Sequence, residues 1–267
     1  MKLVDLIRIS KPITWASGPE FLSSLDLIEI DITYACNLKC LNCNRSCSQA
    51  PDDSFMSVNQ LEKFLTESII NNRKWRRIRL LGGEPFLHPK IFDFLDTLLN
   101  YKKQYSCHTN LEVSTNGYGR LVNDKIKLVP SEVKINNTYK ESTQQKFEPF
   151  NQAPCDLWYH KFIDYKNGCW VTNECGIGLN MYGFYHCAVA AGIDRVLGLD
   201  IGLKSIPSTA EQMIEQKRQL CRFCGHFLSR QHISSHLREK LEEEVISKTW
   251  MEAYSKYKEK RSTLTKY

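Results

Sequence analysis

The sequence predicts an α/β protein whose strands form a parallel sheet. In the first half of the 267-residue chain, segments with the period of a strand alternate with segments with the period of a helix. Parallel strands in this order need helical crossovers, which are right-handed in nearly all proteins. Polar motifs rich in Cys, Gly or Asn directly follow the first three predicted strands. In barrels of alternating strands and helices, this end of the strands is where functional sites are built.

The periodicity and the end signals define each element in turn. Residues 27–32 alternate between apolar and acidic side chains and are β-branched, as expected for a strand. Ser57 is the expected N-cap of a helix over residues 57–72. Further strands are expected at 77–81, 111–115 and 132–135, and further helices at 91–101 and 122–129.

Beyond residue 139 the pattern loosens into a loop. A further strand is expected at 161–165, a glycine-marked hairpin within 169–187, and a charged C-terminal helix at 238–260. These changes divide the chain into a lead-in at 1–24, an α/β unit at 25–165, a cysteine-rich unit at 166–230 and a helical tail at 231–267.

Length and composition fit a globular chain of one or two domains. The chain is 42% hydrophobic and 25% charged, and its 36 Lys and Arg against 30 Asp and Glu give a formal charge of +6. The densest basic run, 72–79, is interpreted as a helix end followed by a strand rather than a nucleic-acid patch. No apolar run resembles a signal peptide or a membrane span. We therefore expect a cytoplasmic protein whose partners include neither nucleic acid nor a membrane.

Cys36, Cys40 and Cys43 form a C-x3-C-x2-C motif after the first predicted strand. Three thiolates can hold three irons of a four-iron cluster, which leaves one iron open to a substrate or cofactor. Eleven cysteines in a reducing compartment favour metal binding over a disulfide framework. From these residues alone, zinc with Cys47 as a fourth ligand and plain thiols remain alternatives.

The order of the motifs resembles that of the radical S-adenosylmethionine (SAM) enzymes. The cysteine motif follows the first strand, GGEP at 82–85 the second, and STNG at 114–117 the third. The resemblance covers residues 27–135 and implies a partial (β/α)6 barrel of the TIM type. It also implies that Cys36, Cys40 and Cys43 hold a [4Fe-4S] cluster whose open iron binds SAM. An electron from the reduced cluster would then cleave SAM into methionine and a 5′-deoxyadenosyl radical.

The same resemblance implies which residues contact SAM. Gly82 to Pro85 would hold its methionine amino group, with glycines for close backbone approach and Glu84 as a carboxylate or a brace for the turn. Ser114 and Asn116 would bind the ribose or the methionine carboxylate. Asn42 stands where the family usually has an aromatic residue near the adenine. A plain polar turn is the alternative for these segments. The cofactor-binding candidates are therefore Asn42, Gly82, Gly83, Glu84, Pro85, Ser114 and Asn116.

The later cysteines resemble those of the twitch domain, the shortened form of the SPASM extension. There, Cys175, Cys187, Cys221 and Cys224 would close an auxiliary [4Fe-4S] cluster with no open iron. Cys169 is the alternative to Cys175, and a zinc ribbon is the alternative to the cluster.

Three further cysteines have no ligand role in this interpretation. Cys47 is expected to be a loop thiol beside the first cluster. Cys107 and Cys155 are interpreted as small buried hydrophobes. Donation of a hydrogen atom to a substrate radical is the functional alternative for either of the last two.

The resemblance implies an enzyme that removes a hydrogen atom from a polar small molecule, sugar-like or aminocyclitol-like. The auxiliary cluster would accept or relay an electron, and reduced flavodoxin or ferredoxin would be the electron donor. Two alternatives stand beside it: a radical SAM maturase that modifies a ribosomal peptide, and a non-catalytic zinc or iron-sulfur binding module. Oxidation, epimerisation and dehydration are not distinguished by the sequence, nor is the oligomeric state.

Overall fold

A mostly parallel sheet lies at the centre of the computed structural model, which describes residues 3–140, 148–230 and 243–267. Among these residues the strand order is β4-β3-β2-β1-β5-β6. The strands are β1 (Leu27–Thr33), β2 (Arg77–Gly82), β3 (Asn110–Thr115), β4 (Val133–Asn137), β5 (Ile177–Asn180) and β6 (Gly183–Tyr185). The first five pair in parallel, whereas β6 is antiparallel to β5. The predicted α/β class with a parallel sheet is confirmed.

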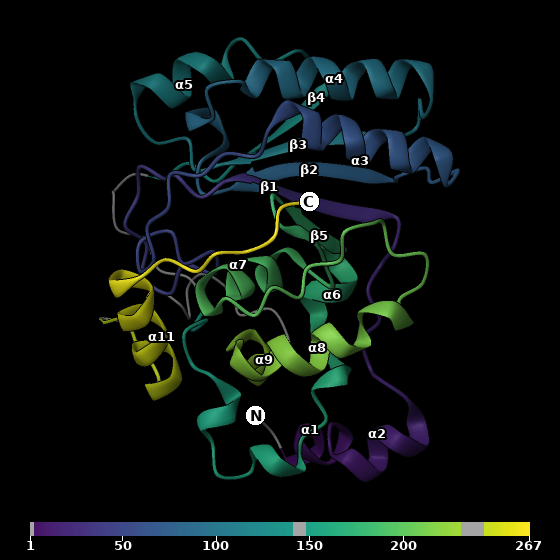
Figure 1. The fold of residues 1–267 in the computed structure, drawn as a ribbon. Coiled ribbons are helices and arrows are strands. Elements are labelled where there is room, and N and C mark those ends of the chain that lie inside the picture. Colours follow the sequence, from purple (N-terminus) through teal and green to yellow (C-terminus); the bar gives the residue numbers. More distant parts are fainter. Residues whose placement is uncertain (1–2, 141–147, 231–242) are drawn as a thin grey trace.

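Three helices connect the first four strands: α3 (Val58–Ile70), α4 (Ile91–Gln104) and α5 (Arg120–Ile126). They gather around β2, β3 and β4 in the upper part of Figure 1. The Ser57 hydroxyl accepts a hydrogen bond from the Gln60 amide at 3.2 Å, and the Gln60 side chain accepts one from the Ser57 amide at 3.0 Å. This capping box fixes the start of α3 where the sequence predicts it.

The alternation in β1 sorts its side chains onto two faces of the sheet. Ile28, Ile30 and Ile32 are buried in the core that contains Phe64 of α3 and Phe94 of α4. Glu29 and Asp31 belong to the opposite face, where they pair with Arg45. The charged face is therefore the inner wall of the partial barrel.

The remaining helices are gathered around β5 and β6. They are α6 (Trp170–Glu174), α7 (Ala188–Leu197), α8 (Ile214–Leu220), α9 (His226–Ser229) and, at the side of the molecule, α11 (Lys248–Glu259). α1 (Leu3–Arg8) and α2 (Lys11–Ser17) lie at the lower end in Figure 1. A second apolar core joins α7 to Trp250 and Tyr254 of α11.

The hairpin after residue 169 joins the sheet instead of forming a separate layer. β5 pairs with the edge of β1 that β2 leaves free, through Ile28, Glu29 and Ile30. The fifth and sixth strands therefore extend the sheet from β1 and do not continue it beyond β4. As a result, the cysteine-rich unit lies directly beside the strand that precedes the Cys36 motif.

Two expected elements differ from the structure. The strand expected at 161–165 does not form, because Ile163 makes only an isolated bridge to Ser10 between the 3-10 turns His160–Phe162 and Tyr165–Asn167. The expected C-terminal helix is present as α11, whereas positions 238–242 lie outside the described residues. The basic run 72–79 follows the end of α3 and includes the first residues of β2, so its interpretation as a helix end followed by a strand is confirmed.

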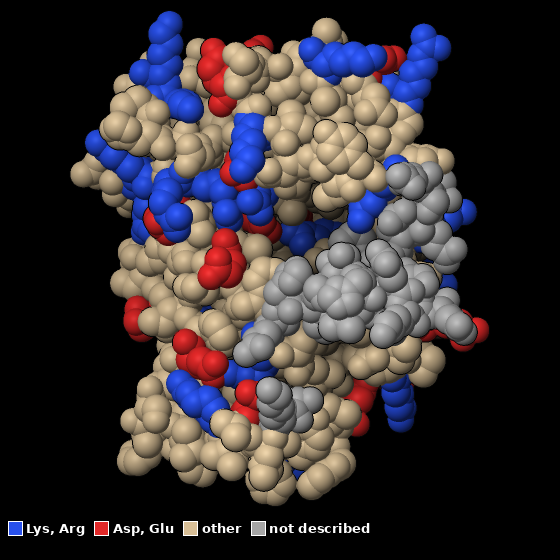
Figure 2. All heavy atoms as spheres, turned by 180° about the vertical axis from the view of Figure 1, so that it is seen from behind, with Lys and Arg blue, Asp and Glu red and all other residues tan. Residues whose placement is uncertain are grey.

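The exposed charges are of both signs. On the face shown in Figure 2, blue Lys and Arg side chains lie among red Asp and Glu side chains. In the part of the chain that the structure describes, no helix combines the length and the hydrophobicity needed to cross a bilayer.

Candidate functional site

The polar ends of β1, β2 and β3 surround a cavity of about 460 Å³, called here the barrel cavity. Of the ten residues predicted to bind the first cluster or SAM, seven line it: Cys36, Cys40, Cys43, Gly82, Gly83, Ser114 and Asn116. Three others do not: the side chains of Asn42, Glu84 and Pro85 are buried beside it. The structure therefore brings the three sequence motifs together around one space.

Gly82 and Gly83 let the end of β2 lie against the start of the cysteine loop. A Cβ atom on Gly82 would stand 2.1 Å from the Thr33 carbonyl oxygen, and one on Gly83 would stand 2.2 Å from that of Ala35. The Gly83 amide donates to the Thr33 carbonyl at 2.8 Å, and the Glu84 amide to the Ala35 carbonyl at 2.8 Å. Only glycine permits this approach, because the contacts are to backbone atoms that cannot rotate away.

Glu84 braces the turn, which is one of the two roles expected for it. Its carboxylate accepts hydrogen bonds from the Thr115 hydroxyl and the Asn116 amide, each at 2.8 Å, and from the Phe86 amide at 3.1 Å. Burial raises the pKa of this carboxyl, although the three hydrogen bonds oppose the shift. Glu84 thus ties the end of β2 to the end of β3 and holds Asn116 at the cavity wall.

The three thiols of the motif differ in their surroundings. Burial raises the pKa of Cys36 to about 12, and the Asn116 amide nitrogen is 3.9 Å from its sulfur. A hydrogen bond with Cys47 lowers the pKa of Cys43 to about 6. Cys47 itself is buried and also lines the barrel cavity. It therefore lies where the sequence analysis expects a loop thiol beside the site.

The backbone of Asn42 is hydrogen-bonded to a residue of the C-terminal region. Asn42 has a φ of 52°, and its amide donates to the Glu244 carboxylate at 2.8 Å. Glu244 also accepts from Gln49 at 2.6 Å, and Gln49 in turn donates to the Cys40 carbonyl at 3.2 Å. Both polar atoms of the buried Asn42 side chain lack a partner among the described residues.

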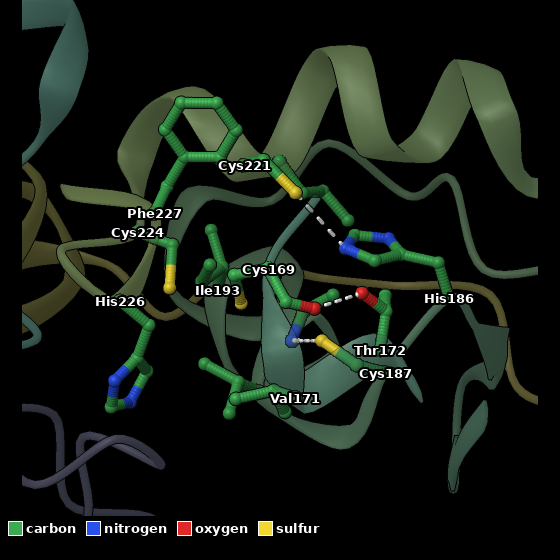
Figure 3. Close-up of a pocket in the computed structure, with 13 residues that line it drawn as sticks. Cys169, Val171, Thr172, His186, Cys187, Ile193, Cys221, Cys224, His226 and Phe227 are labelled. Atoms are coloured by element: carbon green, nitrogen blue, oxygen red, sulfur yellow. Dashed lines mark hydrogen bonds between the residues drawn. The ribbon is translucent and has the colours of Figure 1, made fainter. Parts of the chain in front are cut away.

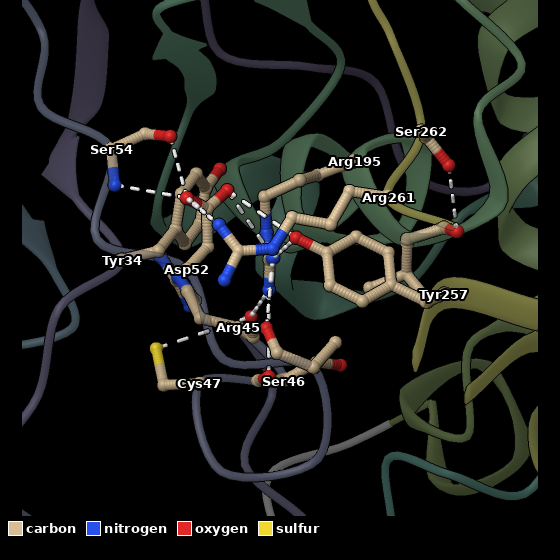
Figure 4. Close-up of polar contacts among 12 residues, drawn as sticks. Tyr34, Arg45, Ser46, Cys47, Asp52, Ser54, Arg195, Tyr257, Arg261 and Ser262 are labelled. Carbon is tan, nitrogen blue, oxygen red and sulfur yellow. Dashed lines mark hydrogen bonds and ion pairs between the residues drawn. The ribbon is translucent and has the colours of Figure 1, made fainter. Parts of the chain in front are cut away.

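Arg195 of α7 clamps the other end of the same loop, as Figure 4 shows. Its guanidinium donates to the carbonyls of Ala50 at 2.9 Å and Arg45 at 3.0 Å, and it lies 3.6 Å from the Asp52 carboxylate. It also stands over the Tyr34 ring, 4.3 Å from the centroid. Because Arg195 is buried, these contacts fix the loop to the second core.

The floor of the barrel cavity is a buried network of charges. Glu29 accepts from Arg79 at 2.9 Å and from Arg45 at 3.2 Å, and Arg79 also pairs with Glu112 at 2.7 Å. Asp31 lies 3.4 Å from Arg45, and burial raises its pKa to about 6. Glu29, Arg45 and Arg79 line the cavity. Sequence reasoning missed this network, although the acidic residues alternating along β1 were its signal.

Four other thiols surround a much smaller cavity of about 10 Å³, called here the thiol pocket. They are Cys169, Cys187, Cys221 and Cys224, and Figure 3 shows their sulfurs around a common space. Four thiols and no carboxylate are the donor set of a closed iron-sulfur cluster or of a structural zinc. Within the described ranges, no three Cys, His, Asp or Glu side chains converge closely enough to share one metal ion.

Cys175 does not lie in the thiol pocket. It lines the barrel cavity, where Glu29, Arg45 and Arg79 are the charged groups nearest to it. The reason is local: Gly176 follows with a φ of 81°, and β5 then runs beside β1, which leaves Cys175 at the inner wall. Cys169, at the N-cap of α6, takes the place in the thiol pocket that the sequence analysis gave to Cys175.

Burial dominates the chemistry of the thiol pocket. It raises the pKa of Cys169 to about 11 and that of Cys187 to about 12, and it raises those of Cys221 and Cys224 well above the ordinary thiol value. The His186 ring lies 3.3 Å from the Cys221 sulfur, and burial lowers the pKa of this histidine well below its usual value. Burial therefore favours the neutral thiol over the thiolate at all four positions.

The two cavities share a wall. Val171, Val189 and His226 line both of them. The His226 Nδ1 and the Glu148 carboxylate are 2.8 Å apart, which fixes the ring in this wall. The remaining two cysteines lie elsewhere. Cys107 is exposed, so the expectation that it is a small buried hydrophobe is wrong, and the sulfur of the partly buried Cys155 is 3.7 Å from the Thr249 hydroxyl.

Comparisons with known proteins match the first half of the chain. A family model described as the Radical SAM superfamily matches residues 30–129. GTP 3′,8-cyclase of Aliarcobacter butzleri is 31% identical over 100 residues, which are 37% of this chain and 29% of that protein. GTP 3′,8-cyclase of Nautilia profundicola is 30% identical over 101 residues, which are 37% of this chain and 30% of that protein. The chain thus spans about 30% of the length of these relatives.

Among solved structures, the chain is similar to the crystal structure of BtrN in complex with AdoMet and 2-DOIA. The TM-score is 0.40 at 14% identity, with 84% of this chain and 89% of that chain covered. The matched family segment contains all three cysteines of the Cys36 motif, together with GGEP and STNG. The motifs that gather around the barrel cavity thus lie in a segment, residues 30–129, that is similar to the radical SAM superfamily of enzymes.

Proposed function

We propose that this protein cleaves SAM reductively in the barrel cavity and uses the resulting radical to remove a hydrogen atom from a polar small molecule. The observation that carries the proposal is the convergence of Cys36, Cys40 and Cys43 with Gly82, Gly83, Ser114 and Asn116 on one cavity. When bound, a [4Fe-4S] cluster and SAM supply the 5′-deoxyadenosyl radical, and an auxiliary cluster accepts or relays an electron.

The chain's own residues would bind and orient these groups. Cys36, Cys40 and Cys43 would hold the first cluster. The close approach at Gly82 and Gly83 brings backbone polar groups to the cavity wall, where they can face the methionine part of SAM. Asn116, held by Glu84, would face the same ligand.

For the second cluster we propose Cys169, Cys187, Cys221 and Cys224 as ligands. This set replaces Cys175 by Cys169, because only the latter lies in the thiol pocket. The pocket offers four thiols, so no coordination position would be left for a substrate. The proximity of the two cavities, which share Val171, Val189 and His226, supports a role in electron transfer.

The charged floor supports a substrate rich in hydroxyl or amino groups, such as a sugar or an aminocyclitol. Glu29 offers a carboxylate, Arg45 and Arg79 offer guanidinium donors, and Thr138 offers a hydroxyl along the same cavity. The cavity of about 460 Å³ must also hold a cluster and SAM. The space that remains suits a small molecule better than an extended peptide. Reduced flavodoxin or ferredoxin is the proposed electron donor.

Anaerobic reconstitution with iron and sulfide tests the proposal. We expect about eight irons and a similar amount of acid-labile sulfide per chain. Dithionite and SAM should then yield 5′-deoxyadenosine, measured by liquid chromatography, and Cys40→Ala should abolish it. Cys107→Ala is the matched control, because that thiol is exposed and away from both cavities. About two zincs per chain without sulfide would instead support the non-catalytic binding module.

A substrate panel separates the two enzymatic alternatives. In the presence of excess SAM and dithionite, an aminocyclitol or a sugar should increase the yield of 5′-deoxyadenosine over the background. Peptides should leave it unchanged. Stimulation by peptides alone would favour the maturase alternative.

A further inference from the structure

The thiol pocket contains one polar side chain that faces a cysteine sulfur, His186. Its Nε2 lies 3.3 Å from the Cys221 sulfur, and the residue is only 2% exposed. Figure 3 shows the imidazole ring beside Cys221, at the rim of the space that the four sulfurs surround. The other ring nitrogen, Nδ1, has no hydrogen-bond partner among the described residues.

This arrangement decides which ring nitrogen carries the proton once a metal is bound. A thiolate that ligates iron has no hydrogen left to donate, so the histidine must be the donor. Buried N–H groups without a partner are rarer in proteins than buried acceptors without one, and Nδ1 is the atom without a partner among the described residues. The favoured neutral tautomer of His186 therefore carries its hydrogen on Nε2. The imidazolium form would also carry a hydrogen on that nitrogen.

The position of the ring is fixed by the backbone around it. The His186 amide donates to the Gln216 side chain at 2.9 Å, and its carbonyl accepts from the Ser23 hydroxyl at 3.1 Å. Gln216 also donates to the carbonyls of Phe184 at 2.9 Å and Ile201 at 2.8 Å. Gln216 lies on α8, the helix that ends directly before Cys221. These contacts therefore fix the position of the His186 ring relative to the Cys221 sulfur.

At the first cysteine site, the sulfurs of Cys36 and Cys43 have neighbours of a different kind. The Asn116 amide is 3.9 Å from the Cys36 sulfur and also donates to Asn37 at 2.8 Å. Cys43 has a thiol neighbour, Cys47. The hydrogen bonding of these two sulfurs therefore differs from that of Cys221, which has an imidazole beside it.

Hydrogen bonds to the sulfurs are one of the means by which proteins set the potential of an iron-sulfur cluster. A donor stabilises the reduced state more than the oxidised state, because the reduced cluster carries one more negative charge. We propose that His186 donates a hydrogen bond from Nε2 to the Cys221 sulfur and thereby raises the reduction potential of the auxiliary cluster. The inference rests on the proposed function, in that the thiol pocket holds that cluster. A higher reduction potential favours the auxiliary cluster as the acceptor of an electron rather than as its donor.

The test measures a potential and needs no substrate. In a variant in which Cys36, Cys40 and Cys43 are all replaced by Ala, only the second site can hold a cluster. An iron count of about four, with matching sulfide, confirms that site before any titration. Redox titration followed by electron paramagnetic resonance then gives its reduction potential.

Two substitutions of His186 distinguish the effect of its hydrogen bond on the potential from the effect of its packing. In this background His186→Leu removes the donor and should move the potential to a more negative value. His186→Gln keeps an amide N–H of similar reach and should recover part of the shift. His88→Gln is the control, since His88 is also buried but bonds to the Met56 carbonyl, away from the thiol pocket. It should leave the potential unchanged.

The possible failures are distinguishable. Equal potentials for the parent, His186→Leu and His186→Gln, each with about four irons, would overturn the role of His186 and leave the cluster in place. A triple-Ala variant that folds, as judged by circular dichroism, but holds no iron would overturn the cluster assignment itself, and the inference with it.

Discussion

At the scale of single residues, the position of each cysteine decides its chemistry. Cys169 and Cys175 are six positions apart, but α6 separates them, and they face different cavities. Cys169 lies among three other thiols, whereas Cys175 lies beside Glu29, Arg45 and Arg79. A buried carboxylate and two guanidiniums can form a polar wall for the proposed substrate, and four thiols are the donor set of the proposed second cluster.

Substitution of these two cysteines should therefore have different results. Cys169→Ala should lower the iron content of the reconstituted protein from about eight to about four per chain, because the second cluster loses a ligand. Cys175→Ala should leave the iron content unchanged. Iron and sulfide analysis of the two variants, prepared in parallel, makes the measurement. Loss of iron from Cys175→Ala alone would restore the ligand set expected from the sequence.

Asp31 should make the stability of the fold depend on pH. Burial raises its pKa from 3.8 to about 6, so the folded protein keeps a proton that the unfolded chain has released. The free energy of unfolding should thus fall as the pH rises through this window. At about 1.4 kcal/mol per unit, the fall is of the order of 3 kcal/mol.

Asp31→Asn should remove this part of the pH dependence. The measurement is the urea midpoint of unfolding between about pH 4 and pH 7. Asp26→Asn is the control, because that carboxylate is half exposed and pairs with the exposed Arg76. A decline in the Asp31→Asn variant as steep as in the parent would assign the effect to another group.

At the scale of the elements, the junction between β1 and β2 positions the first site. The two strands pair in register from Leu27 with Arg77, and the register shifts between Asp31 and Thr33, just before the cysteine loop. Gly82 and Gly83 then allow β2 to end against the backbone of Thr33 and Ala35. The loop and the GGEP turn are thus held together by backbone contacts, before any side chain contributes.

Gly83→Ala tests this junction. The Cβ would stand 2.2 Å from a backbone oxygen, so the two strand ends must separate. We expect a loss of about 1–3 kcal/mol in stability, together with weaker SAM binding measured by calorimetry on the reconstituted protein. Gly192→Ala in α7 is the control, because its nearest neighbour would be 3.3 Å away. A Gly83→Ala variant as stable as the parent would show that this junction is not tightly packed.

At the scale of the whole molecule, the hairpin β5-β6 brings the two cysteine sites together. Because β5 pairs with β1, α6 and α7 lie beside the barrel cavity, and Val171, Val189 and His226 become a common wall. Arg195 of α7 adds a second link by holding the carbonyls of the cysteine loop. The two sites are therefore adjacent and joined by packed and hydrogen-bonded side chains.

This closeness should be visible in electron paramagnetic resonance. When both clusters are reduced, their unpaired electrons should interact across the common wall. The signal of the doubly loaded protein should then saturate at higher microwave power than that of the triple-Ala variant or of Cys169→Ala. Equal saturation in all three samples would place the clusters too far apart for direct electron transfer.

The sequence could predict the parts of the fold that depend on local pattern. Alternation in β1, the Ser57 cap and the glycines of GGEP each act over a few residues, and the corresponding elements are confirmed. The strand expected at 161–165 was wrong, because a strand needs a partner along its length and Ile163 meets only Ser10. The local sequence pattern does not show which other segment of the backbone would pair with a predicted strand.

By itself, the sequence determined the chemistry proposed for the first site, since the spacing of Cys36, Cys40 and Cys43 and the order of the three motifs indicate the superfamily whose model matches residues 30–129. Only the tertiary structure decided which later thiols share a pocket. That outcome depends on the pairing of β5 with β1, a contact between residues 28–30 and 177–179. This pairing places Cys175 at the wall of the barrel cavity. Cys169 instead lies with the thiol that precedes α7 and the two that follow α8. The spacing of cysteines along the chain does not indicate a strand pairing between such distant residues. The set of thiols that share the second pocket could therefore be assigned only from the tertiary structure.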